Sequence, residues 1–85
     1  MKHASAETLG LLEALLVKLR NLPALQEKKL GIFYVKSKPY LHFHEDPAGI
    51  FADVRLCGET FERFSVNTKH EQEAFLKLVA KNRAA

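Results

Sequence analysis

The stretch that decides the fold of this chain is Tyr40-Leu41-His42-Phe43-His44-Glu45, in which apolar and polar residues alternate. Side chains of a β-strand point alternately to the two faces of a sheet. The pattern therefore predicts a strand with Tyr40, His42 and His44 on one face and with Leu41 and Phe43 on the other.

Turn signals on both sides of this strand predict an antiparallel sheet. Ser37-Lys38-Pro39 precedes the strand. Asp46-Pro47-Ala48-Gly49 follows it, with aspartate, proline and glycine in the positions that a β-turn favours. The expected strands cover residues 30–36, 40–45, 50–56 and 60–66.

The two loops also predict the register of the strands. The loop at 46–49 places His42 opposite Asp53, and the loop at 37–39 places Phe33 opposite Phe43 and Tyr34 opposite His42. One face of the sheet then collects almost only apolar side chains, namely Phe33, Val35, Leu41, Phe43, Ala52, Val54 and Leu56. This apolar face is expected to lie under the helices.

Two helices are expected outside the strands. Residues 5–20 carry a leucine stripe at spacings of three and four, begin at the capping residue Ser5 and end before Pro23. Residues 69–83 follow a capping box formed by Thr68 and Glu71. Residues 22–29 are expected to be a polar connection with one helical turn. The prediction is an α+β fold with the order helix, four-stranded antiparallel meander, helix, and with both helices on one face of the sheet.

Composition limits the class of protein. The 85 residues, 47% of them hydrophobic, are expected to form a single domain over 1–85 with one modest core. A single cysteine, Cys57, excludes an intramolecular disulfide framework and suits a reducing compartment. No apolar run is long enough to span a bilayer and no secretory segment is evident, so a cytoplasmic setting without membrane partners is expected.

The second face of the sheet is the predicted functional surface. It mixes aromatic, imidazole and charged side chains, a composition typical of ligand pockets and subunit interfaces. The candidate binding residues on it are Tyr34, Tyr40, His42, His44, Asp53 and Arg55. The favoured function is a non-enzymatic binding or interaction module that engages a small anionic ligand or a second copy of the chain, with Arg55 as the anion contact. A cross-strand pair of Arg55 with Glu62 is the structural alternative.

A metal site or a small enzyme is the alternative prediction. His42 and His44 point the same way, and Asp53 across the ladder would complete a three-ligand set. The structural alternative to a metal site is that His42 and His44 are cross-strand partners and that His42 is hydrogen-bonded to Asp53. No nucleophile motif surrounds Ser37, Ser65 or Cys57, so no catalytic residue is assigned, catalysis is less favoured and no cofactor is expected.

Single-stranded nucleic-acid binding is a third interpretation. Aromatic residues on a sheet with flanking lysines are typical of stacking platforms, and the net charge is +3. However, no ribonucleoprotein-type motif is present in the predicted strands, which makes nucleic-acid binding the weakest of the three interpretations.

The segments Gly31–Asp46 and Ala52–Leu56 resemble the core of small bacterial proteins of similar length. The resemblance spans most of residues 30–79 and implies a stand-alone bacterial cytosolic domain. It carries over no catalytic residues.

Overall fold

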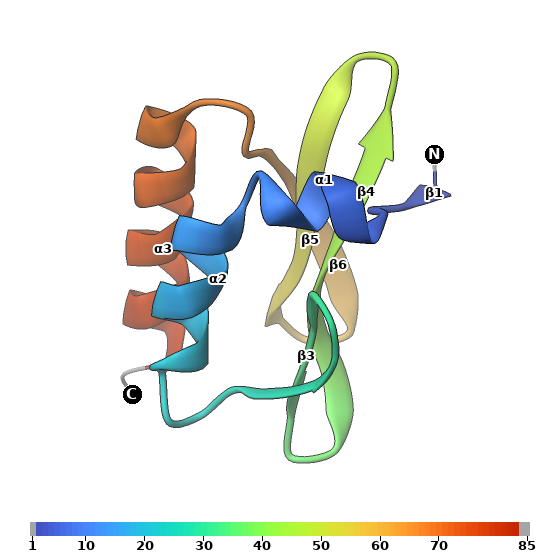
Figure 1. Ribbon diagram of the computed structural model, residues 1–85. Coiled ribbons are helices and arrows are strands. Elements are labelled where there is room, and N and C mark those ends of the chain that lie inside the picture. Colours follow the sequence, from blue (N-terminus) through green and yellow to red (C-terminus); the bar gives the residue numbers. More distant parts are fainter. Residues whose placement is uncertain (1, 84–85) are drawn as a thin grey trace.

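The computed structural model describes residues 2–83 and has an α+β fold with one antiparallel sheet (Figure 1). Its elements are β1 (Lys2–His3), α1 (Ala6–Gly10), α2 (Glu13–Arg20), β2 (Gln26–Lys29), β3 (Ile32–Val35), β4 (Lys38–Asp46), β5 (Gly49–Cys57), β6 (Thr60–Ser65) and α3 (Lys69–Arg83). The strands follow the order β2-β3-β4-β5-β6, and β1 pairs with β4 beside this path. The α+β class is confirmed. The four expected strands correspond to β3 to β6, and the sheet also contains β2 and β1, which precedes the first helix.

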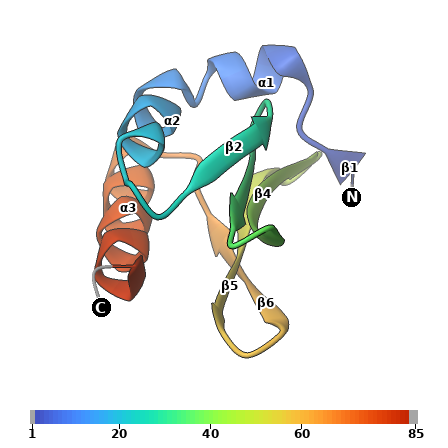
Figure 2. The ribbon, with the colours of Figure 1, turned by 90° about the horizontal axis from the view of Figure 1, so that it is seen from below.

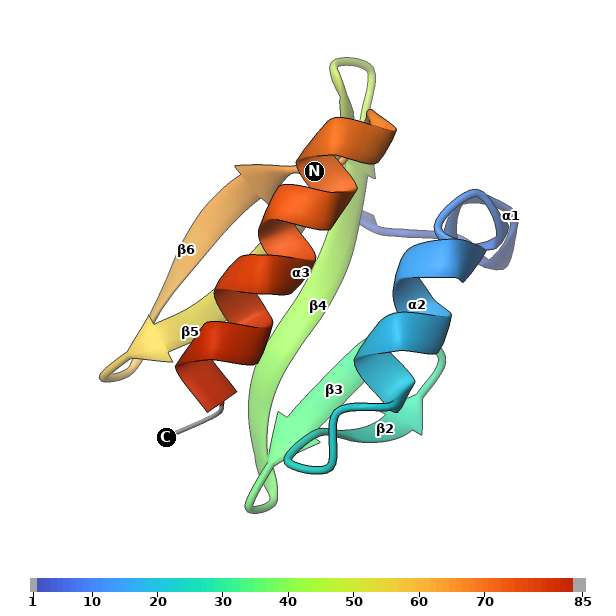
Figure 3. The ribbon, with the colours of Figure 1, turned by 90° about the vertical axis from the view of Figure 1, so that its left-hand side faces the viewer.

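The helices form one layer against the sheet. Helices α2 and α3 lie side by side over the same face of the sheet (Figure 3). Seen from below, the chain runs from β1 through α1 into α2, with α3 beside α2 (Figure 2). The core between the layers contains the apolar face of β3, β4 and β5 together with leucines of α1 and α2 and residues Phe75 and Val79 of α3. None of the helices in the described part of the chain is long and apolar enough to cross a membrane.

The hairpin of β4 and β5 has the predicted register. Phe43 lies opposite Ala52, and His42 lies opposite Asp53. The carboxylate of Asp46 accepts a hydrogen bond from the Ala48 amide at 2.7 Å, as expected for an aspartate at the start of a turn.

The hairpin of β3 and β4 differs from the prediction because its turn is shorter. The turn residues are Lys36 and Ser37, both with positive φ (51° and 69°), and β4 already begins at Lys38. Two-residue hairpin turns with two positive φ angles match the twist of the strands. Phe33 therefore lies opposite Leu41 rather than Phe43, and Tyr34 lies opposite Pro39 rather than His42.

A β-bulge at Tyr40 follows from this pairing. Leu41 and Pro39 face consecutive residues of β3, so Tyr40 is an extra residue without a partner in the ladder. A bulge interrupts the alternation of faces and re-aims a side chain. Tyr40 is 1% exposed, and its hydroxyl donates a 2.7 Å hydrogen bond to Oδ1 of Asn82 in α3. The prediction that Tyr40 lies on the exposed face was wrong.

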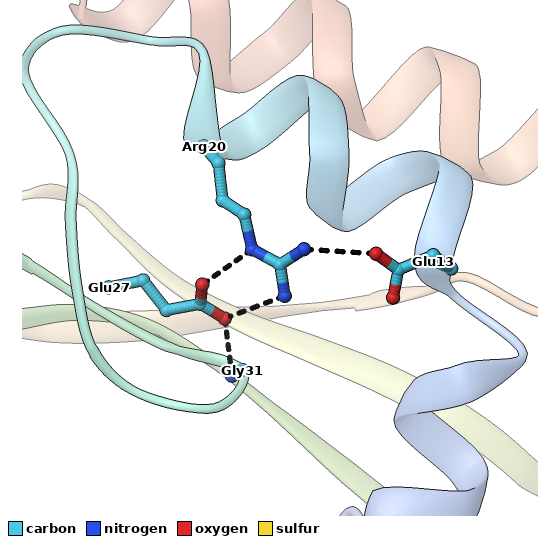
Figure 4. A network of polar contacts seen from close by, with 4 residues as sticks. All are labelled: Glu13, Arg20, Glu27 and Gly31. Atoms are coloured by element: carbon cyan, nitrogen blue, oxygen red, sulfur yellow. Dashed lines mark hydrogen bonds and ion pairs between the residues drawn. The ribbon is translucent and has the colours of Figure 1, made fainter.

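Strand β2 was missed by the sequence prediction, which made residues 22–29 a connection. It pairs with β3 through a turn at Gly31, whose φ is 75°. The carboxylate of Glu27 accepts the Gly31 amide at 2.8 Å and the guanidinium of Arg20 at 2.5 and 3.2 Å, while Arg20 also reaches Glu13 at 3.0 Å (Figure 4). This network ties an edge strand to α2.

The predicted helix over 5–20 is two helices. Ser5 caps α1 by accepting the Thr8 amide at 3.2 Å, as expected, but the helical pattern stops at Gly10 and resumes at Glu13. Glycine has a low helix propensity, which favours a break at this point. The break leaves Leu11 exposed and Leu12 fully buried. At the other end, the capping box of α3 is confirmed: Thr68 Oγ1 accepts the Glu71 amide, and the Glu71 carboxylate accepts the Thr68 amide, both at 3.1 Å.

Candidate metal centre

Three histidines form a cluster on the face of the sheet opposite α2 and α3. His42 and His44 alternate with the buried Leu41 and Phe43 in β4, so they point away from the helices. His3 belongs to β1. One ring nitrogen from each histidine lies within 4.8 Å of the other two. We refer to His3, His42 and His44 as the histidine cluster.

Strand pairing brings His3 to this cluster from the N-terminal end of the sequence. The start of β4 pairs with β3, and its last residues pair with β1, where His3 lies opposite His44. The Ala4 amide donates to the Phe43 carbonyl at 3.0 Å, and this bond extends the attachment beyond His3. Opposite residues of an antiparallel pair share a face, so the His3 and His44 rings stack, with centroids 4.9 Å apart.

The rings are in contact with one another and with one aromatic neighbour. The centroids of His42 and His44 are 4.6 Å apart with the ring planes nearly perpendicular. The Phe61 ring of β6 lies 4.9 Å from that of His42. Burial and the neighbouring imidazole of His44 lower the pKa of His42, against the opposing effect of Asp53. The environment thus favours the neutral imidazole of His42, the form that binds metal ions.

Asp53 supports the cluster from β5. Its Oδ2 lies 3.2 Å from Nε2 of His44, and both of its oxygens accept hydrogen bonds from Arg63, at 2.8 and 2.9 Å. These hydrogen bonds, and the charge of Arg63, hold the pKa of the Asp53 carboxyl below its usual value although burial acts to raise it. The expected hydrogen bond from His42 to Asp53 is replaced by these contacts with His44 and Arg63.

Two ring nitrogens of the cluster are buried without a hydrogen-bond partner among the described residues. They are Nδ1 of His42 and Nδ1 of His44. A buried polar atom that lacks a partner costs about 1–3 kcal/mol, so such atoms in a native protein call for an explanation. A metal ion could be that partner, because a neutral imidazole nitrogen can donate its lone pair to it.

The donor set fits a transition-metal ion. Imidazole suits zinc, copper, nickel and iron, and a tetrahedral zinc holds two nitrogens about 3.3 Å apart. The ring nitrogens lie within 4.8 Å of one another, and any pair wider apart than the separation in a zinc site would close in on a bound ion. The carboxylate of Asp53 next to His44 corresponds to the carboxylate that commonly orients a metal-binding histidine.

The six predicted site residues are divided between three places. His42, His44 and Asp53 lie together. Tyr40 and Arg55 line a separate cavity, and the Tyr34 ring lies 5.1 Å below the Nζ atom of Lys28. Arg55 does not pair with Glu62: its Nε donates to the Pro39 carbonyl at 3.0 Å and its Nη1 to the Gly58 carbonyl at 3.1 Å.

Sequence reasoning missed His3, Phe61 and Arg63. No local pattern could have identified His3, because a two-residue strand has no periodicity. Arg63 lies opposite Asp53 in the β5–β6 pair, and a complete register for β6 would have revealed it. The register shifts between Val54 and Cys57, so counting residues back from the turn at Gly58 does not pair Asp53 with Arg63.

No protein-family model, curated protein or solved structure matches this chain. The geometry of the histidine cluster and its carboxylate therefore carries the functional argument alone.

Proposed function

We propose that this protein binds one divalent transition-metal ion through His3, His42 and His44. The observation that carries the proposal is the pair of buried Nδ1 atoms without partners in a cluster of three imidazoles. Three nitrogen donors fill three of the four positions of a tetrahedral zinc ion. A fourth position would then be open on the solvent side, where His3 is exposed.

Asp53 and Arg63 act on this site without binding the ion. Asp53 orients His44 through Nε2, which leaves Nδ1 as the donor of that ring. Arg63 in turn fixes both oxygens of Asp53 and keeps the carboxylate ionised. Such supporting contacts typically change metal affinity by about 10- to 100-fold when they are removed.

Binding of a second copy is the other proposal for the same face. The face carries Phe61, a large apolar side chain 37% of which is exposed, next to the histidine cluster. Association of two copies through this face is compatible with metal binding, because the exposed ring of His3 lies at its surface. The mass of the native protein reports both the number of chains and the presence of a metal ion, so one measurement tests both proposals.

The test is native mass spectrometry of the full chain with and without one equivalent of zinc, followed by calorimetric titration. We expect one ion per chain, and a loss of affinity of at least about tenfold in each of His3→Gln, His42→Gln and His44→Gln. The matched control is His70→Gln, because His70 is the only other histidine and lies exposed on α3. Circular dichroism of each variant shows whether the fold is retained.

Three results would overturn the proposal. The first is zinc binding that His70→Gln weakens as much as His42→Gln does. The second is zinc binding by the folded triple variant of the histidine cluster with the affinity of the wild type. The third is a dimer that forms equally with and without zinc and contains no metal, which would assign the face to self-association instead.

A further inference from the structure

The cavity lined by Tyr40 and Arg55 lies where the β3–β4 turn, the end of β5 and the end of α3 meet, and it is independent of the histidine cluster. Its volume is about 290 Å³. Four cationic side chains line it, and no lining residue in the described part of the chain is acidic. The cationic side chains are those of Lys36, Lys38, Arg55 and Arg83. Nearly a third of the 13 lysines and arginines of the chain thus converge on one cavity.

Arg55 is held in place by backbone carbonyls on two sides. It donates Nε–H to Pro39 and Nη1–H to Gly58, at 3.0 and 3.1 Å. A guanidinium has five N–H donors, so three remain after these two bonds. A guanidinium that is already oriented loses little conformational entropy when it binds an anion.

Arg83 is held by Tyr40. Its guanidinium carbon lies 5.0 Å from the centre of the Tyr40 ring, within the range of a cation–π interaction. The tyrosine is in turn fixed by its hydrogen bond to Asn82, whose Nδ2 donates to the Leu56 carbonyl at 3.0 Å. Burial raises the pKa of Tyr40, while the charges of Arg83 and Arg55 both act to lower it. Both guanidinium groups line the same cavity as this ring.

The β3–β4 turn, which contains Lys36 and is followed by Lys38, has an unfavourable sequence. Lys36 and Ser37 both adopt positive φ, where Asn-Gly is the favoured pair. Strained backbone of this kind clusters at ligand sites, where the surrounding structure maintains it. Here the strain accompanies a turn that places Lys36 and Lys38 at the rim of the cavity.

We infer that this cavity binds the phosphate group of a small phosphate ester, with Arg55 and Arg83 as its fixed contacts and Lys36 and Lys38 at its rim. Two guanidinium groups provide paired N–H donors, from which the oxygens of a phosphate can accept hydrogen bonds. The apolar side chains of Val35 and Leu56, together with the Tyr40 ring, line the remainder and suit the organic part of the ligand. A compact cavity favours a small ligand over nucleic acid, for which cationic residues follow an extended stripe.

The experiment is an amide-resolved NMR titration of metal-free protein with inorganic phosphate and then with pyrophosphate. The metal is first removed with a chelator, and the chelator is then removed by dialysis because it is itself a polyanion. We expect saturable shifts of the amides of Lys38, Leu56 and Gly58, with a dissociation constant of about 1 mM or tighter. Added salt should weaken the binding.

Three variants test the assignment of residues. Arg55→Gln should weaken binding by about tenfold or more, and Lys38→Gln by about two- to fivefold. Lys77→Gln is the matched control: it removes the same charge from an exposed position of α3 that does not line the cavity, and should change affinity by less than about twofold. Lys38 is exposed at the start of β4, so its replacement leaves a folded protein even if Arg55→Gln does not.

Three outcomes would overturn the inference. The first is the absence of saturable shifts around the cavity. The second is an equal loss of affinity in Lys38→Gln and Lys77→Gln. The third is tight binding of a single-stranded oligonucleotide that neither phosphate nor pyrophosphate displaces. None of them bears on the histidine cluster, whose residues do not line this cavity.

Discussion

Arg63 donates two hydrogen bonds to the two carboxylate oxygens of Asp53, and this pair joins β5 to β6 behind the histidine cluster. The carboxylate is nearly buried, whereas the guanidinium is half exposed. Without the guanidinium, the contact that remains for the buried carboxylate among the described residues is the one with Nε2 of His44 at 3.2 Å.

Arg63→Gln is therefore expected to lower the urea midpoint of unfolding, because it leaves Asp53 with fewer hydrogen bonds in a buried position. Arg63→Lys should fall between this variant and the wild type, since lysine keeps the charge but not the fork. Glu62→Gln on the same strand is the control and should leave the midpoint unchanged. Equal midpoints for Arg63→Gln and Glu62→Gln would contradict the prediction.

The network of Glu27 predicts a dependence of stability on pH. Partial burial acts to raise the pKa of Glu27, but hydrogen bonds from Arg20 and from the Gly31 amide, with the charge of Arg20, lower it overall. A carboxyl with a lower pKa in the folded state stabilises the fold above its unfolded pKa, and this contribution is lost as the pH falls through the folded value.

Glu27→Gln should consequently lower the free energy of unfolding at about pH 7 by about 0.5–1 kcal/mol, and by much less at about pH 3. Urea unfolding at the two pH values measures both differences. Glu59→Gln, at an exposed carboxylate in the β5–β6 turn, is the control. A deficit in Glu27→Gln that is as large in acid as at neutral pH would show that the carboxylate charge is not the cause.

The β3–β4 turn predicts a stabilising substitution. Replacement of Lys36-Ser37 by Asn-Gly fits both positive φ angles and should raise the free energy of unfolding by about 1 kcal/mol. Lys38→Asn, one residue further and in extended backbone, should not stabilise. If the Asn-Gly variant unfolds at the same urea concentration as the wild type or lower, the turn carries no such strain.

Gly31 and Gly58 form a matched pair for glycine substitution. Both have positive φ, at 75° and 67°. A Cβ atom at Gly31 would lie 2.8 Å from Cδ2 of the buried Leu9, whereas nothing lies within 4 Å of the same atom at Gly58. Gly31→Ala should destabilise by about 2 kcal/mol and Gly58→Ala by about 1 kcal/mol, as measured by thermal unfolding. Similar losses in the two variants would mean that Leu9 moves aside freely.

Periodicity and turn chemistry predicted the centre of the fold well. The alternation in β4 and the Asp46 turn correctly placed Phe43 against Ala52 and His42 against Asp53, because a buried face and a tight turn both fix the register. The β3–β4 register failed because Lys36-Ser37 lacks the residues typical of a turn with positive φ, while Ser-Lys-Pro carries misleading turn signals.

The candidate sites were predicted only in part. His42, His44 and Asp53 are brought together, as their spacing indicated. The position of Tyr40 depends on a bulge, which inserts a residue without leaving a pattern in the sequence. His3 reaches the cluster through long-range pairing of a two-residue strand, and such a strand is too short for propensity or periodicity to identify.

The shortest strand of the sheet supplies the third imidazole of the histidine cluster. Beyond its pairing with β4, the segment is held by the Ala4 amide on Phe43 and by the Ser5 amide on Glu45. A two-residue strand opens more often than the centre of a sheet. Detachment of residues 2–5 from β4 and removal of the His3 ring from the histidine cluster are thus a single event. A bound ion would then lengthen the hydrogen-exchange lifetimes of the Ala4 and Ser5 amides and leave those of β5 unchanged.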